Sequence, residues 1–341
     1  MNPLLTVLID TYNHERYIEQ AVISAIEQDF PSSAYEILVV DDGSTDRTPE
    51  IVRKFAPRVR LLQKKNGGQA SAFNAAFPEI RGDIVAFLDG DDWFAPGKVT
   101  AVMHALEEFP ESAAVGHGYY EFHETSGETK ICCPSQPAFL HLGTREAARE
   151  ASPGWSFGLM GALTVRRAVF ERVVPIPEIL VFCGDAPILI SSMVAGIRVL
   201  AQPLFYYRHH SSNLQATGPA NVVRLRRKTE MNEITFQILE PLLVRFGVPR
   251  ESVAAFLYPH WVGHSRFRLR AIGGSRIETF KTEMRAFRLD HTEATIRYCL
   301  FKYLIVGGAT LLVPPASFYR IRDWYAQRNL GRFREQFARS R

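Results

Sequence analysis

Four apolar segments alternate with four amphipathic ones over the first 110 residues, and this alternation constrains the fold more than any other feature of the sequence. The apolar segments, which we expect to be strands, span residues 4–10, 35–42, 59–65 and 84–88. Each is followed by a segment with apolar residues at helical spacing. Strands that alternate with helices predict a mostly parallel sheet between layers of helices, with ligands at the carboxyl ends of the strands.

Aspartates stand where three of these strands end. They are Asp10 after the first strand, Asp41 and Asp42 after the second, and Asp89, Asp91 and Asp92 after the fourth. Because the carboxyl ends of parallel strands share one edge, these carboxylates converge, and at about 4 Å two of them repel by roughly 4 kcal/mol at an effective dielectric near 20. A D-x-D triplet alone is weak evidence, but convergent acids without matching Lys or Arg suit a hard divalent cation with a bound diphosphate.

The second half of the chain differs in pattern and charge. After Pro110 we expect a hairpin over 113–124 and 129–133 and strands near 159–167 and 199–210, followed by helices from about residue 220. Residues 1–219 carry 18 basic and 26 acidic residues, whereas 220–341 carry 22 and 10. This asymmetry predicts an acidic catalytic part and a basic part that faces an anionic partner such as lipid headgroups. No nucleic-acid-binding motif accompanies it, so nucleic acid is not an expected partner.

Seven segments carry a resemblance to family-2 glycosyltransferases of the GT-A fold. Residues 7–28, 35–48, 66–77 and 82–99 resemble the successive donor-side blocks of that family, and residues 161–173, 183–199 and 205–213 resemble its acceptor half. The resemblance covers residues 4–213 and implies an inverting, metal-dependent transfer of a sugar from a nucleotide-diphospho-sugar, with UDP-sugars favoured, to a hydroxyl of a glycan or lipid-linked acceptor. An expected role is the synthesis of cell-envelope polysaccharide.

The resemblance implies roles for residues on the donor side. Thr11 and Tyr12 match the loop that holds the nucleotide base, with the tyrosine ring as a stacking platform, and Asp42 matches the aspartate that binds base or ribose. A packed aromatic and a plain Asp/Gly turn are the simpler alternatives for these residues. The residues that match the loop beside the donor sugar and phosphates are Asn66, Gly67 and Gln69. Phe73 departs from the family pattern, since many relatives carry arginine there.

The resemblance also implies the metal ligands. Asp89 would bind the ribose side and Asp91 would coordinate Mg²⁺ or Mn²⁺ on the diphosphate. Arg208 and His210 match an Arg-x-His element, in which the cation binds phosphate and the imidazole binds the metal, with surface residues after a strand as the alternative. Asp92 is expected either to support this acidic group or to cap the helix that starts near Pro96.

Asp185 is the expected general base. Relatives usually show Glu-Asp before the acceptor-side helix, whereas this chain has Gly184 followed by Asp185. The carboxylates at the strand ends are assigned to nucleotide and metal, and Glu121 and Glu124 lie in a hairpin without a matching block. The alternative role for Asp185 is that of a helix N-cap.

The sequence predicts two domains: residues 1–215 as a GT-A domain, with a nucleotide-sugar half (1–110) and an acceptor half (111–215), and residues 216–341 as a helical, basic region. Within the latter, residues 299–318 are apolar, but Lys302, the glycine pair and Pro314-Pro315 argue against a spanning helix. We expect either an interfacial segment on an anionic membrane or a helix packed on the protein or on a second subunit.

Two alternatives to this function remain open at the level of sequence. A nucleotidyltransferase would share the sheet and the acids, although it would show a glycine-rich loop with Arg and Lys near its start. A catalytically silent protein that binds carbohydrate or nucleotide-sugar would keep the fold without a base. The first residues lack a secretory signal, and the four cysteines predict neither a disulfide framework nor a zinc site, so a cytoplasmic protein, peripheral on the inner face of the plasma membrane, is expected.

Overall fold

The computed structural model of the chain describes residues 4–152, 160–211, 213, 222–290, 300–322 and 324. It divides into two compact units, each described by itself: unit 1 holds residues 1–216 and 234–256, and unit 2 holds residues 217–233 and 257–341. Most of the Lys and Arg residues that the predicted basic region has beyond residue 290 lie outside the described residues.

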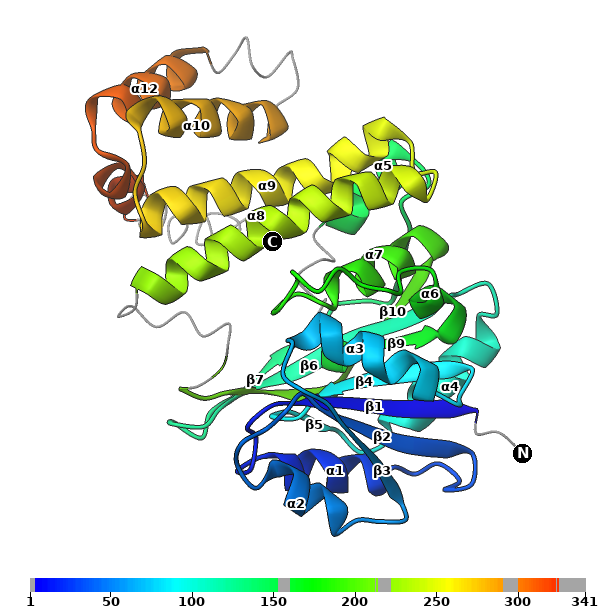
Figure 1. The fold of residues 1–341 in the computed structure, drawn as a ribbon. Coiled ribbons are helices and arrows are strands. Elements are labelled where there is room, and N and C mark those ends of the chain that lie inside the picture. Colours follow the sequence, from blue (N-terminus) through cyan, green and yellow to red (C-terminus); the bar gives the residue numbers. More distant parts are fainter. Residues whose placement is uncertain are drawn as a thin grey trace, which may run out of the picture. The chain divides into compact units, whose positions relative to one another are not determined.

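Unit 1 contains a mixed sheet with a parallel half that carries the expected strands (Figure 1). The strands of its described part are β1 (Leu5–Thr11), β2 (Tyr35–Asp41), β3 (Val59–Gln63), β4 (Ile84–Asp89), β5 (Trp93–Phe94), β6 (Ala114–His123), β7 (Thr129–Cys132), β8 (Ala138–Leu140), β9 (Leu163–Arg166) and β10 (Ile197–His209). Their main order is β3-β2-β1-β4-β9-β6-β10-β5, with β7 beside β6 and β8 beside β10. The predicted parallel sheet and the β6–β7 hairpin are confirmed.

The sequence did not predict every pairing. The strand expected near 159–167 is present as β9, but it inserts antiparallel between β4 and β6. The short strands β5 and β8, which pair antiparallel with β10, were not expected. Both have only two or three residues, too few for a periodic pattern to be read.

Helices cover both faces of this sheet. They are α1 (Ile18–Ile26), α2 (Thr48–Arg53), α3 (Gln69–Ala76), α4 (Lys98–Glu108), α5 (Arg145–Ala151), α6 (Arg167–Glu171) and α7 (Ala186–Ala195). Alternate residues of β1 divide between the faces, because Val7 and Ile9 pack with the apolar sides of α1 and α4 in one core cluster. On the opposite face Phe73 of α3 is buried among Phe87 and Phe170, with ring centroids 5.7 and 6.1 Å away. The residue that departs from the family pattern is therefore a core aromatic.

Longer helices follow. They are α8 (Val222–Arg245), α9 (Arg250–Ala271), α10 (Arg276–Asp290) and α12 (Leu300–Leu312), which confirm the predicted helical region. In unit 2 a small core forms around Leu269, Phe318 and Tyr319. The buried carboxylate of Glu283 accepts two hydrogen bonds from Arg266, at 2.9 and 2.8 Å, and one from Arg322. Among the described helices, none is both long and apolar enough to cross a membrane.

Candidate active site

The carboxyl ends of β1 and β4 bring Asp10, Asp89 and Asp91 together as the sequence predicted. The expectation that the acids have no matching Lys or Arg was wrong for Asp42, which pairs with Lys64 over 2.6 Å. Asp10 and Asp89 are register partners on the two adjacent strands, and their carboxyl groups influence each other's pKa. Burial raises the pKa of Asp10 to about 7 and raises the pKa of Asp89 well above its usual range, with the neighbouring acids adding to the effect at Asp89. The raised pKa values make this pair easier to protonate than exposed aspartates, and protonation of either carboxyl reduces the repulsion in the cluster.

Asp91 is the ionised member of the cluster. Its Oδ2 lies 3.0 Å from Nε2 of His210 and 3.3 Å from Nδ2 of Asn213, and Nε2 of His14 is 3.8 Å away. Burial acts to raise the pKa of Asp91, but the hydrogen bond from His210 and the charge of His14 outweigh it and lower the pKa. The structure thus brings together the two predicted metal ligands, Asp91 and His210.

The middle residue of the D-G-D triplet is fixed by close packing. A Cβ at Gly90 would lie 2.5 Å from Oγ1 of Thr11 and 2.9 Å from Nδ1 of His14. Any side chain would therefore push the loop after β1 away from the acidic turn. Thr11 is buried in this contact and donates to or accepts from His14 over 3.2 Å, whereas the ring of Tyr12 is 43% exposed.

Arg208 joins β10 to the acidic turn. Its backbone N–H donates to Oδ1 of Asp92 over 2.8 Å, and its Nε donates to the carbonyl of Asp91 over 2.8 Å. The guanidinium lies 4.4 Å from the ring centroid of Trp93 and is hydrogen-bonded to Oε1 of Gln20. The side chain is only 7% exposed, so its donors are directed at protein groups in this structure, and its predicted contact with phosphate stays a prediction.

Asp92 is not a helix cap, so that alternative was wrong. Helix α4 begins after Gly97, whose left-handed backbone (φ 78°) turns the chain into the helix, and no side chain caps it. The reason is the contact just described, because Asp92 is buried and one of its oxygens accepts from the backbone of Arg208. Asp92 therefore supports the acidic turn through its buried hydrogen bond to the backbone of β10.

Asp42 holds the loop that precedes α3. Its carboxylate accepts hydrogen bonds from the backbone N–H groups of Gly67 (3.0 Å) and Gly68 (2.7 Å) and from Nζ of Lys64 (2.6 Å). The carboxylate is buried, so the predicted contact with base or ribose stays a prediction. Next to this loop Asn66 is exposed, and Nε2 of Gln69 lies 3.5 Å from Oδ2 of Asp10.

A second loop holds the segment that carries Tyr12. Asn13 has a left-handed backbone (φ 57°), donates its N–H to Oγ of Ser44 over 2.8 Å and accepts from the N–H of Thr45 over 2.8 Å. The N–H of Glu15 donates to Oδ2 of Asp46 over 3.0 Å. The turn after β2 therefore fixes the loop after β1. The sequence analysis gave a plain Asp/Gly turn as the alternative for this segment, but it did not predict that the turn binds the neighbouring loop.

Asp185 occupies the N-cap position of α7, but its side chain makes no capping hydrogen bond. Burial raises the pKa of its carboxyl to about 6, and its charge raises the pKa of Asp89, so the two acids are electrostatic neighbours. The residue before it is constrained, because a Cβ at Gly184 would lie 2.6 Å from N and 2.8 Å from Cα of Ala70. The glutamate of the family pattern has no room at this position.

Three residues near the acids were missed from the sequence. His14 and Asn213 both approach Asp91, and Asp10 was recognised as a strand-end acid without a role in the site. His14 stands four residues beyond the end-of-strand acid and Asn213 three beyond His210, but neither spacing is a motif. Their approach to Asp91 depends on the adjacency of β1 and β4 and on the turn after β10.

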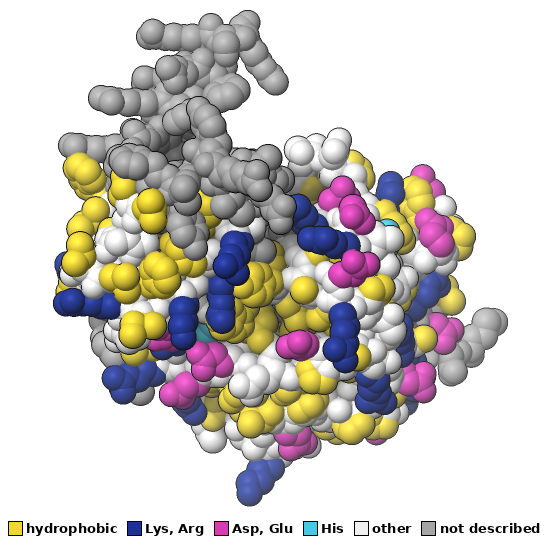
Figure 2. All heavy atoms as spheres, turned by 90° about the horizontal axis from the view of Figure 1, so that it is seen from above, with side chains coloured by type: hydrophobic (Ala, Val, Ile, Leu, Met, Phe, Trp, Pro, Cys, Tyr) yellow, Lys and Arg dark blue, Asp and Glu magenta, His cyan; other side chains and the backbone are white. Residues whose placement is uncertain are grey.

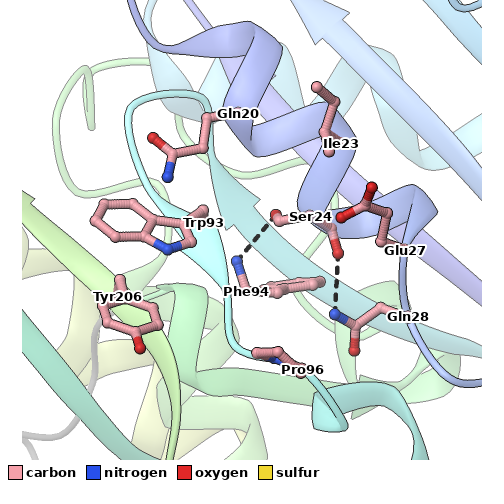
Figure 3. Close-up of a pocket in the computed structure, with 9 residues that line it drawn as sticks. All are labelled: Gln20, Ile23, Ser24, Glu27, Gln28, Trp93, Phe94, Pro96 and Tyr206. Carbon is pink, nitrogen blue, oxygen red and sulfur yellow. Dashed lines mark hydrogen bonds between the residues drawn. The ribbon is translucent and has the colours of Figure 1, made fainter.

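A pocket lies beside the site, between α1 and the strand pair β5–β10 (Figure 3). Its volume is about 360 Å³, and its lining includes Gln20, Trp93 and Tyr206. The rings of Trp93 and Tyr206 stack at 4.6 Å, and Gln20 is the residue that binds the Arg208 guanidinium. Arg208 therefore connects this pocket to the acidic turn.

Comparison with known proteins gives consistent results. Residues 6–174 match the model of glycosyl transferase family 2. An uncharacterized glycosyltransferase from Nostoc sp. is 30% identical over 251 residues, which cover 71% of this chain and 76% of the relative. The poly(ribitol-phosphate) beta-N-acetylglucosaminyltransferase TarS of Staphylococcus aureus is 39% identical over 92 residues, 26% of this chain and 16% of TarS.

Solved structures share the fold. Residues 1–349 of TarS in complex with UDP-GlcNAc superpose with a TM-score of 0.53 at 22% identity, over 84% of this chain and 88% of that one. The mannosyltransferase PcManGT from Pyrobaculum calidifontis, in complex with GDP-Man and Mn²⁺, gives a TM-score of 0.50 at 19% identity, over 92% and 88%. At these identities the likeness concerns the fold alone.

Proposed function

The chain belongs to glycosyl transferase family 2, and from that premise we propose which reaction it catalyses and which residues take part. It is a glycosyltransferase that uses a nucleotide-sugar donor. We propose that it transfers the sugar with inversion from a nucleotide-diphospho-sugar, in the first place a UDP-sugar, to a hydroxyl of a cell-surface glycan or its lipid-linked precursor. Family membership favours this reaction over nucleotidyl transfer and over silent binding.

The observation that carries the proposal is the position of Asp185 relative to the acids at the strand ends. Asp185 comes from the acceptor-side helix, its carboxylate makes no cap bond, and it interacts electrostatically with Asp89 of the donor side. A base in this position takes the proton of the acceptor hydroxyl while the hydroxyl oxygen bonds to the anomeric carbon and the nucleoside diphosphate leaves from the opposite face. Inversion follows from one such displacement.

Asp91 and His210 are proposed to hold Mn²⁺ or Mg²⁺. The ionised carboxylate and the imidazole lie 3.0 Å apart, and Oδ1 of Asp10 is a further buried oxygen without a hydrogen bond among the described residues. Carboxylate oxygens with one imidazole suit these ions, Mn²⁺ in particular. When bound, the ion supplies charge that offsets the negative charge on the leaving diphosphate. PcManGT, of similar fold, was solved with Mn²⁺.

The remaining donor contacts are proposed from their placement. The exposed ring of Tyr12 is available to stack on the base. Asn66 and Gly67 lie just before α3 and Gln69 is its first residue. The N–H groups of Gly67 and Gln69 already donate to Asp42 and to the carbonyl of Val181, so we propose that the side chains of Asn66 and Gln69 contact the donor sugar and phosphates, with Gly67 allowing their close approach. Thr11 and Asp42 support these two loops, and Asp89 faces the ribose side. A phosphate contact by Arg208 requires it to release Gln20 or the carbonyl of Asp91.

Donor screening tests the proposal. The full chain would be mixed with UDP-, GDP- and dTDP-sugars with and without Mn²⁺, and the melting temperature and sugar hydrolysis or transfer would be measured. We expect one nucleotide class to raise the melting temperature, more so with Mn²⁺, because a ligand that binds only the folded state stabilises it. Absence of any shift or turnover with all three classes contradicts the proposed donor.

We also propose that unit 2 binds an anionic membrane surface peripherally, at the inner face of the plasma membrane. Helix α12 buries Gly307 and Thr310 while it exposes leucines, with Leu312 77% exposed. The large apolar residues that are exposed in α12 and in the described residues after it are Leu304, Ile305, Leu311, Leu312, Ile321 and Trp324. Binding at a membrane interface combines such apolar residues with basic ones. Figure 2 shows hydrophobic, Lys or Arg, and Asp or Glu side chains interspersed on the face that it displays.

Flotation with liposomes tests the membrane proposal. Leu311→Ser with Leu312→Ser is expected to release the protein from liposomes that contain anionic lipid, whereas Ile131→Ser, an exposed residue of β7, leaves the distribution unchanged. Failure of the intact chain to float contradicts membrane binding. If the chain instead sediments as a dimer and the leucine variants sediment as monomers, the leucines pack against a second subunit.

A further inference from the structure

Two neighbouring strands place three ligand-type side chains on one face of the sheet. Strands β6 and β10 run parallel, with His123 opposite His209 and Glu121 opposite Tyr207. Because side chains two residues apart point to the same face, Glu121 and His123 of one strand meet His209 of the other. The register therefore builds the cluster, and it does not arise from mobile surface loops.

The contacts within this cluster are short. Nε2 of His209 lies 2.6 Å from Oε1 of Glu121, and the imidazoles of His123 and His209 stack with centroids 4.5 Å apart and planes inclined by 5°. One ligand atom from each of the three residues lies within 4.8 Å of the others. The ring of Tyr207 stands edge-on against His209 at 4.7 Å, and Sγ of Cys132 lies 3.9 Å from the other oxygen of Glu121.

We propose that Glu121, His123 and His209 form a second metal site, for a Zn²⁺-type ion, separate from the site at Asp91. Two imidazoles and one carboxylate are the ligands that Zn²⁺ prefers, whereas Mg²⁺ prefers oxygen alone. Ligand atoms about 2.0–2.1 Å from a tetrahedral ion lie roughly 3.3 Å apart. To bind the ion, Glu121 and His209 must therefore separate from their 2.6 Å contact, and the two parallel imidazoles must turn so that both point a ring nitrogen at it. All three residues are partly exposed, so water can reach a fourth position.

The site is distinct from the candidate active site although the two are neighbours in the chain. His209 is followed by His210, which points to Asp91, while His209 itself points to Glu121. An ion bound by His123 and His209 joins the end of β10 to β6 directly before the residue that approaches Asp91. The site would thus hold the strand end that carries Arg208 and His210, without contact to the donor-side acids.

Zinc titration of the full chain tests the inference. Protein freed of metal with a chelator would be titrated with Zn²⁺ against a chromophoric competitor, and Co²⁺ would report the coordination by its visible absorption. We expect the wild type to bind one Zn²⁺ at this site and Asp91→Ala to bind it with the same affinity. In His123→Ala and in His209→Ala the affinity should fall more than about 100-fold, since loss of a residue that only hydrogen-bonds to a ligand already lowers metal affinity 10- to 100-fold. His104→Ala is the matched control, because His104 also faces a carboxylate, Glu108, at 3.7 Å on an exposed surface.

Two results overturn the inference. The first is an equal Zn²⁺ affinity of the wild type and His123→Ala, which would mean that Glu121 and His209 form an ordinary hydrogen-bonded pair and no metal site. Alternatively, Asp91→Ala could lose the Zn²⁺ that His123→Ala retains, which would place the ion in the active site. Circular dichroism of each metal-free variant checks its fold, and if His209→Ala does not fold, Glu121→Gln provides the same comparison while it keeps a hydrogen-bonding group beside His209.

Discussion

Nε2 of His210 lies 3.0 Å from Oδ2 of Asp91, and this contact joins residues 119 positions apart in the sequence. It brings the end of β10 onto the turn after β4, so the acceptor half of the chain completes a site that begins in the donor half. The contact also explains why the pKa of Asp91 is lowered, whereas burial raises the pKa of Asp10 and of Asp89.

Asp91→Ala is expected to abolish metal-dependent donor binding and turnover without unfolding the protein. The change removes a partly exposed carboxylate at the sheet edge and no packing group. Isothermal titration with the donor and Mn²⁺, together with thermal melting, measures both effects. The control is Asp83→Ala, an exposed aspartate just before β4 that should bind donor like the wild type. Mn²⁺-dependent activity at the wild-type level in Asp91→Ala would show that the metal lies elsewhere.

Arg208→Lys distinguishes a structural role of Arg208 in holding the acidic turn from a role in binding the donor phosphate. Lysine keeps the charge but loses the planar fork that binds Gln20 and the carbonyl of Asp91 and stacks on Trp93. If these contacts are its main role, we expect the free energy of unfolding to fall by about 1–3 kcal/mol and turnover to fall with it. Urea unfolding and donor titration distinguish the roles, since an unchanged stability with a weaker donor affinity would assign Arg208 to phosphate.

The strand ends and their acids could be predicted from sequence because both depend on local pattern. The apolar run before Asp89 and its D-G-D turn are contiguous, and the parallel order follows from alternation with helices. The approach of His14 to Asp91 could not be predicted, since it requires β1 to lie beside β4. The alternative of Asp92 as a cap failed for a similar reason, because its partner, the backbone of Arg208, is 116 positions away.

Gly184→Ala is expected to destabilise the protein and to lower turnover, although the family pattern has a larger residue there. The new Cβ would lie 2.6 Å from the backbone N of Ala70, so either α7 or the first turn of α3 must move. Overpacking of this kind costs about 1–3 kcal/mol. The matched control is Gly263→Ala inside α9, where nothing lies within 4 Å of the added methyl group and helix propensity favours alanine by about 1 kcal/mol. Equal stability of the two variants would contradict the packing described at Gly184.

Asp185→Asn is expected to leave donor and metal binding intact and to lower turnover by roughly 10² to 10⁴, the usual contribution of a general base. Asp185 makes no capping hydrogen bond, so below pH 3.8, where the wild-type carboxyl is protonated, the free energy of unfolding should change by only a few tenths of a kcal/mol. At neutral pH the variant should be more stable than the wild type, because it lacks the buried charge. A variant that keeps more than about a tenth of wild-type turnover, well above the loss expected for a base, would exclude Asp185 from catalysis.

The pH dependence gives an independent measure of the same residue. The base must be ionised, and burial raises the pKa of Asp185 from 3.8 to about 6, so the turnover of the wild type should fall tenfold per pH unit below about pH 6. The free energy of unfolding depends on pH in the opposite direction. The folded state binds the proton of Asp185 more tightly than the unfolded state does, so the contribution of Asp185 to stability is fully present below pH 3.8 and is lost as the pH rises through about 6. Asp185→Asn should lack both dependences. A comparison of pH–rate and pH–stability profiles of the two proteins measures them, and a wild-type rate that is flat from pH 7 to pH 5 would contradict a base with this pKa.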